Sequence, residues 1–244
     1  MLKCTTHLFL HCRLNTALQE EGLPSDNLVE LISGPELGKT QLCLHVACAS
    51  AASGDLVRCP QTAPTSASCP PLYSVTLRII SLPTKVLYVD THGSCVADRL
   101  LTLLQTQTPD VDAAARRISV VTVTDIFQMF RVLEEHRQLL AVRKDAAGDM
   151  AGDDPRAVFR GGVIILDSIS ALVSPILGGG QVWGHALMMT LSSELKRLAQ
   201  EYQAAVLVTN SYVGSRNNGV GQPGLGHSWL SAPHLRLDLA ALFE

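Results

Sequence analysis

The most informative part of the sequence is Ser33-Gly34-Pro35-Glu36-Leu37-Gly38-Lys39-Thr40. It follows an apolar run at 27–32, which predicts a strand, and it leads into a run at 39–53 whose apolar residues have helical spacing. A turn between a strand and a helix presents backbone N–H groups and the positive end of the helix, which together favour an anion. The stretch matches the pattern GxxxxGK(S/T) of phosphate-binding loops, except that Ser33 stands where the first glycine is expected.

The residue types in this stretch fit the binding of a nucleoside triphosphate. Gly38 lets the backbone come close to phosphates, Lys39 is expected to reach the β- and γ-phosphates, and the Thr40 hydroxyl is expected to bind Mg²⁺. The predicted ATP-binding residues are Ser33, Gly34, Pro35, Glu36, Leu37, Gly38, Lys39, Thr40 and Gln41. The alternative is a chance glycine turn before a helix, and the Glu36 carboxylate supports it, because it repels phosphates unless it turns outward.

Beyond this stretch, strand-like and helical runs alternate along the chain. Further strands are expected at 85–90, 118–123, 162–167, 205–209 and 234–239, and further helices at 97–107, 125–140 and 186–202. Apolar strands joined by helices predict a parallel sheet covered on both faces, so we expect one doubly wound α/β domain at 27–244. Residues 1–26 are expected to be irregular or a short helix, 54–83 an insertion, and 143–160 an exposed loop.

The composition narrows the class of protein. Of 244 residues, 47% are hydrophobic and 17% are charged, which allows a sizeable core and excludes a mainly disordered chain or a coiled coil. A net charge of −3 gives no overall attraction to nucleic acid, so such binding needs a local patch. Seven cysteines without a CxxC pair favour free thiols in a reducing compartment. No membrane span is expected, since the apolar stretch 162–177 contains Asp167 and Pro175.

A second motif is typical of nucleotide sites. The run Val163-Ile164-Ile165-Leu166-Asp167 predicts a buried strand ending in a carboxylate, as in the Walker-B motif that holds Mg²⁺. Taken alone, the run is better explained as a buried strand with a capping aspartate. Together with the 33–40 stretch, the metal role is the better interpretation, because ligands of such folds bind at the carboxyl ends of the strands. We therefore expect Thr40 and Asp167 to hold Mg²⁺, with Asp167 also a catalytic candidate.

The order of these motifs resembles the core of the RecA-type recombinases. The matching segments are 34–40, Leu87-Tyr88-Val89-Asp90, Ile164-Ile165-Leu166-Asp167-Ser168 and Val208-Thr209-Asn210. Segments at 125–129, 172–179, 186–189 and 225–229 are similar to paralogues of the eukaryotic strand-exchange recombinase. The resemblance covers residues 14–53 and 84–240.

The resemblance implies a RecA-like P-loop ATPase core that binds ATP and Mg²⁺. It further implies a role in double-strand break repair by homologous recombination, in the nucleus, as part of a hetero-oligomer with other recombinase paralogues. The resemblance also implies that residues 174–183 and 211–226 correspond to the family's two DNA-facing loops, so single-stranded or branched DNA is an expected partner. Arg99 matches an arginine that lies near the adenine in related recombinases, although an ordinary surface arginine explains it equally well.

Departures from the family pattern shape the expected activity. His92 stands where active recombinases carry a glutamate that polarises the attacking water, and neutral imidazole lacks a fixed negative charge. Ser211 replaces a glutamine that senses the γ-phosphate. Residues 54–83 have no family counterpart, and neither the family's small N-terminal domain nor its strands after Leu239 are recognisable, which predicts a shortened or divergent form. We expect a weak, DNA-dependent ATPase at most.

Two other functions stay open. One is a catalytically inactive interaction module of the same assembly, in which Ser33, Glu36 and the shortening of the chain have abolished nucleotide binding. The other is a P-loop enzyme of another class, such as a small-molecule kinase, for which the sequence shows neither a lid nor an arginine-rich acceptor site.

Overall fold

The computed structural model describes residues 23–34, 37–52, 85–95, 97–151, 161–178, 182–213 and 222–241. Several sequence-based predictions lie outside these residues. They are the insertion at 54–83, most of the N-terminal segment 1–26, and the roles of Pro35 and Glu36.

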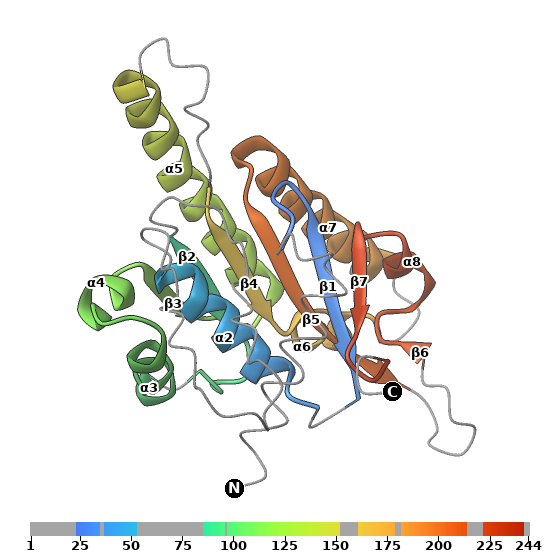
Figure 1. The fold of residues 1–244 in the computed structure, drawn as a ribbon. Coiled ribbons are helices and arrows are strands. Elements are labelled where there is room, and N and C mark those ends of the chain that lie inside the picture. Colours follow the sequence, from blue (N-terminus) through green and yellow to red (C-terminus); the bar gives the residue numbers. More distant parts are fainter. Residues whose placement is uncertain are drawn as a thin grey trace, which may run out of the picture.

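The described residues form a parallel sheet with the strand order β3-β2-β4-β5-β1-β7 (Figure 1). Its strands are β1 (Leu28–Ser33), β2 (Val86–Asp90), β3 (Ile118–Thr122), β4 (Val163–Asp167), β5 (Ala205–Val213) and β7 (Leu235–Asp238). Every neighbouring pair along this order runs in parallel. A short strand, β6 (Gln222–Pro223), pairs antiparallel with the end of β5. The strands predicted from apolar runs are therefore confirmed, within a few residues at each end.

Helices cover both faces of the sheet, which confirms the doubly wound α/β class (Figure 1). One face carries α2 (Lys39–Ala52), α3 (Ala97–Gln107) and α4 (Val111–Ala115). The other carries α5 (Ile126–Ala151), α6 (Ile169–Val173), η1 (Ser174–Ile176), α7 (Val182–Tyr202) and α8 (Gly226–Leu230). Among the described helices, none combines the length and apolar character that crossing a bilayer requires.

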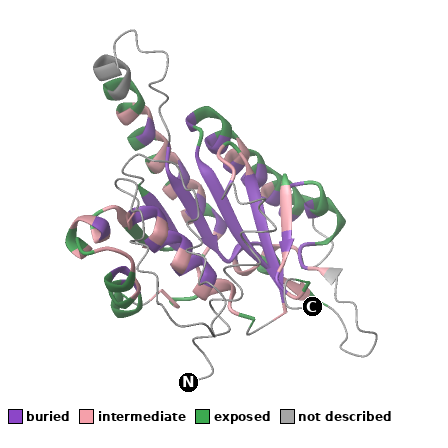
Figure 2. Ribbon diagram, viewed as in Figure 1, coloured by how far each residue is buried: buried purple, intermediate pink, exposed green. Residues whose placement is uncertain are grey.

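The sheet divides the apolar core into two layers, because successive side chains of a strand point to opposite faces. Strand β4 shows this most clearly: Val163 and Ile165 pack with residues of α2, whereas Ile164 and Leu166 pack with residues of α5 and α7. The central strands are buried on both faces, while β3 at the edge is partly exposed (Figure 2). The carboxyl ends of the strands are thereby held in fixed positions along one edge.

Helix α5 begins as predicted but ends later. The Asp125 carboxylate accepts hydrogen bonds from the backbone N–H groups of Phe127 and Gln128 at 2.8 and 2.9 Å, which is an N-cap. The predicted loop at 143–160 is wrong in its first part, because α5 continues to Ala151. Contacts with α7 support this extension: Lys144 Nζ donates to the Glu201 carbonyl at 3.0 Å and lies 5.5 Å from the centroid of the Tyr202 ring. Residues 152–160 lie outside the described part of the chain.

Candidate functional site

The turn between β1 and α2 forms the first part of the site. Its last residue before the helix, Gly38, has a φ angle of +83°, which residues with a side chain rarely adopt. A Cβ atom built there meets no atom within 4 Å, so backbone conformation, and not space, requires glycine. The Gly38 carbonyl then accepts a hydrogen bond from the Leu42 N–H at 2.9 Å, which continues into α2. The start of a helix leaves backbone N–H groups without partners inside the helix, and α2 starts directly after the carboxyl end of β1 and this turn.

The Lys39 ammonium group lies against the start of this turn. Its Nζ atom donates to the Ser33 carbonyl at 3.1 Å, to Ser33 Oγ at 3.0 Å and to the Gly34 carbonyl at 2.9 Å. The Ser33 hydroxyl in turn donates to the Gly34 carbonyl at 2.8 Å. Burial lowers the pKa of Lys39, and the nearby Asp167 carboxylate opposes this by favouring the charged form. Lys39, predicted to bind the phosphates, and Asp167, predicted to hold Mg²⁺, thus lie within electrostatic reach of each other.

The Asp167 carboxylate is the second part of the site. It lies at the end of β4, is 4% exposed, and is held on both oxygens. Tyr88 OH donates to Oδ2 at 3.0 Å, and Thr209 Oγ1 donates to Oδ1 at 2.6 Å. Burial raises the pKa of Tyr88 far above its usual value, so this phenol remains a donor. The sequence analysis gave no such role to Tyr88 or Thr209; a hydroxyl within a buried apolar strand was the available signal, because buried donors need partners.

His92 lies in the turn that follows β2. The Asp90 carboxylate shapes this turn by accepting from the backbone N–H groups of His92 at 2.9 Å and Cys95 at 2.6 Å. Burial favours the neutral form of Asp90, but these and neighbouring backbone hydrogen bonds outweigh it and lower the pKa below the usual value. His92 is exposed, and its Nδ1 lies 3.0 Å from Thr91 Oγ1, which in turn donates to the Asp167 carbonyl at 3.0 Å. His92 is therefore connected through Thr91 to the end of β4.

Arg99 of α3 reaches the helix that carries the turn. Its guanidinium Nη2 donates to Oε1 of Gln41 in the first turn of α2. Both side chains are exposed at this contact. The structure thus brings two predicted nucleotide-binding residues together, although they are 58 positions apart in the sequence.

A buried carboxylate in β1 was missed by the sequence analysis. Glu30 is 0% exposed, and its Oε1 accepts from Asn210 Nδ2 and from Trp229 Nε1, each at 2.7 Å. Its Oε2 forms an ion pair with Arg236 Nε. Asn210 also donates to the Gly224 carbonyl at 3.1 Å. The network therefore joins β1, which leads into the Ser33–Thr40 turn, to Asn210, just before the segment 211–226 that was expected to face DNA, and through Asn210 to Gly224 within that segment.

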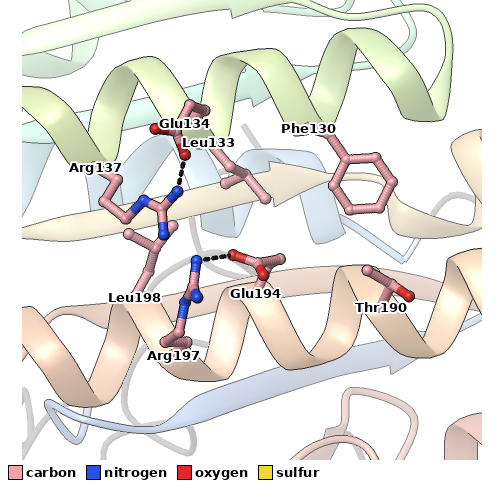
Figure 3. Close-up of a pocket in the computed structure, with 8 residues that line it drawn as sticks. All are labelled: Phe130, Leu133, Glu134, Arg137, Thr190, Glu194, Arg197 and Leu198. Carbon is pink, nitrogen blue, oxygen red and sulfur yellow. Dashed lines mark hydrogen bonds and ion pairs between the residues drawn. The ribbon is translucent and has the colours of Figure 1, made fainter.

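A pocket of about 280 Å³ lies elsewhere, between α5 and α7 (Figure 3). Its sides carry two ion pairs within single helices, Glu134 with Arg137 and Glu194 with Arg197 (Figure 3). The remaining lining residues are Phe130, Leu133, Thr190 and Leu198. None of the predicted nucleotide-binding residues lines this pocket, so its size gives no reason to move the candidate site away from the turn after β1.

The residues at the carboxyl edge fit a nucleotide with a divalent cation. Gly38 gives the backbone the required conformation, Lys39 supplies a positive charge, and Thr40 lies in the first turn of α2. Among the described residues, no group of three or more His, Cys, Asp or Glu side chains could hold a metal ion by itself. If Thr40 and Asp167 hold a cation, as predicted, oxygen atoms of the nucleotide and water would complete its coordination.

The strand order, the turn after β1 and the carboxylate at the end of β4 define a RecA-like P-loop core. The chain is 36% identical over 225 residues to "DNA repair protein RAD51 homolog 4" of Bos taurus, and 35% to the protein of that name in Mus musculus. Each match covers 91% of this chain and 57% of the relative. "DNA repair and recombination protein RadB" of Halobacterium salinarum is 27% identical over 207 residues, which is 84% of this chain and 67% of RadB.

These similarities confirm the family resemblance: the chain belongs with the RAD51 paralogues of the RecA family. It spans little more than half the length of the curated RAD51 relatives that it matches. No protein-family model matches the chain.

Proposed function

We propose that the chain is an ATP-binding subunit that acts in DNA repair by homologous recombination. The names of its relatives support the repair and recombination role. The observation that carries the nucleotide part is the position of Lys39 against the turn after β1, with the Asp167 carboxylate close enough to act on its charge.

Each residue of the site has a defined part in this proposal. The turn residues and Lys39 bind the phosphates, Thr40 and Asp167 hold Mg²⁺, and Gln41 with Arg99 lies beside the nucleotide at the start of α2. Bound Mg²⁺ supplies charge neutralisation for the phosphate oxygens. Tyr88 and Thr209 hold the Asp167 carboxylate in one orientation, because each donates to a different oxygen of it.

We infer that hydrolysis is slow and depends on partners or DNA. His92 is exposed, and one side of its ring is engaged with Thr91. An imidazole can position water but lacks the fixed negative charge with which a carboxylate polarises it, and slow hydrolysis is expected for that reason. A neighbouring subunit can complete the site in trans, for example with an arginine finger that stabilises the negative charge of the transition state.

The partners proposed are other recombinase paralogues, in the nucleus, and single-stranded or branched DNA. Two described segments support DNA contact: α6 and then η1 follow β4, and the β5–β6 pair extends from the end of the neighbouring strand. The central parts of both expected DNA-facing loops, 179–181 and 214–221, lie outside the described residues.

A thermal unfolding experiment tests nucleotide binding. A ligand that binds only the folded chain at 100 times its Kd adds about 2.7 kcal/mol to stability, so Mg-ATP should raise the Tm of the full chain. Lys39→Ala should abolish the increase, while Lys196→Ala, the same change on α7, should leave it intact. If Mg-ATP does not change the Tm of the wild-type chain, the inactive interaction module is favoured. Co-purification with recombinase paralogues then tests whether the chain is part of their assembly.

A further inference from the structure

Ser33, which stands where the P-loop pattern has glycine, gives Lys39 a hydrogen-bond acceptor that glycine lacks. An ammonium group has three N–H donors, and the structure gives Lys39 Nζ three acceptors. Two are backbone carbonyls, those of Ser33 and Gly34, and the third is the Ser33 hydroxyl. Any residue at position 33 provides its backbone carbonyl, but the third acceptor exists only because the side chain is serine.

The Ser33 hydroxyl faces Lys39 as an acceptor. Its own hydrogen is directed to the Gly34 carbonyl at 2.8 Å, so the oxygen presents a lone pair to Nζ at 3.0 Å. In this orientation the hydroxyl has no hydrogen left to give to a phosphate. Ser33 is also completely buried, so water cannot replace the hydrogen bond from Lys39 when that bond is broken.

We propose that the Ser33 hydroxyl competes with the triphosphate for Lys39 and thereby lowers the affinity of this site for nucleotide. The proposal rests on the nucleotide-binding function above and deepens it. A phosphate oxygen that approaches Lys39 takes the N–H that Ser33 Oγ holds, whereas glycine at position 33 leaves that N–H for the phosphate. Ser33 is thus a residue that sets affinity through Lys39.

Side-chain replacements at position 33 test the competition. Ser33→Ala removes the oxygen and keeps Cβ, and Ser33→Cys keeps a side chain of similar size whose sulfur is only a weak acceptor. Binding of a fluorescent N-methylanthraniloyl ATP with Mg²⁺ is measured by titration of the full chain. Ser33→Ala should bind between about threefold and tenfold more tightly than wild type, and Ser33→Cys should lie between the two. Lys39→Ala is the control in which the gain cannot occur.

The outcomes separate competition from a packing role. If Ser33 only supports packing, its variants should have a lower Tm and should bind nucleotide equally well or more weakly than wild type. Tighter binding by folded Ser33→Ala therefore supports the proposal. This holds even if nucleotide binding by wild type is too weak to measure. Equal or weaker binding by the folded variants overturns it and leaves nucleotide binding in place. Failure of every variant and of wild type to bind removes the proposal and the nucleotide function together. If Ser33→Ala does not fold, Ser33→Cys and Ser33→Gly decide in its place.

Discussion

The buried ion pair between Glu30 and Arg236 should contribute measurably to stability. Glu30→Gln preserves volume and the Oε1 atom, so the hydrogen bonds from Asn210 and Trp229 can remain. It places an amide N–H₂ where Oε2 pairs with Arg236, and two donors then face each other. A hydrogen bond between charged groups contributes about 1.5–3 kcal/mol. Arg236 keeps 29% of its side chain exposed and retains some hydration, so we expect a loss of about 2–3 kcal/mol.

Thermal and urea unfolding of the full chain, followed by circular dichroism, measures this loss. For a chain of this size the expected decrease in Tm is about 4–12 °C. The matched control is Glu194→Gln, which breaks an exposed pair with Arg197 at 2.7 Å and should cost less than about 0.5 kcal/mol. A double-mutant cycle of Glu30→Gln with Arg236→Met should give a coupling energy of at least about 1 kcal/mol. Equal effects of Glu30→Gln and Glu194→Gln, or a coupling energy near zero, would refute the reasoning.

Two further predictions concern acid stability and the turn before α2. Burial, with the positive charges of Arg143 and Lys85, lowers the pKa of His136 to about 4, so the fold prefers the neutral ring. The free energy of unfolding should therefore fall by about 3 kcal/mol as pH falls from about 6.5 to about 4, and His136→Gln should remove this part of the acid dependence in denaturant titrations. Gly38→Ala should cost about 1–2 kcal/mol because φ is +83°, measured against Gly34→Ala, whose Cβ meets only Leu37 Cδ1 at 3.9 Å. Equal losses at the two glycines contradict the backbone argument.

The sequence predicted the sheet because its strands are continuous apolar runs, and buried parallel strands have that signature. The helical end of α5 was not predictable in the same way. Residues 143–151 are rich in charged residues, which favoured a loop, but Lys144 is held by Glu201 and Tyr202 of α7. Contacts between helices far apart in the chain override local preference at this point.

In the candidate site, too, residues defined by a local sequence pattern were predictable, and residues defined by distant contacts were not. The positions of Gly38 and Lys39 were predictable because the GxxxxGK(S/T) pattern is local in the sequence and each of its residues has a known role. The structure places both residues after the carboxyl end of β1, where that pattern is expected. The roles of Glu30 and Tyr88 were not predictable, since their partners lie 180 to 206 and 79 positions away, respectively. A charge or hydroxyl inside an apolar strand shows that a partner is needed, but only the fold shows which one.

Because the sheet divides the core into two layers, neighbouring side chains of β4 lie in different layers and can serve as probes of different parts of the molecule. Ile164 and Ile165 are chemically identical and adjacent, yet one packs with the layer of α5 and α7 and the other with the layer of α2. Isotopically labelled methyl groups at these two positions are therefore independent spectroscopic probes. A disturbance that begins at the start of α2 should shift the Ile165 resonance first, with the adjacent Ile164, on the other face of the sheet, as an internal reference.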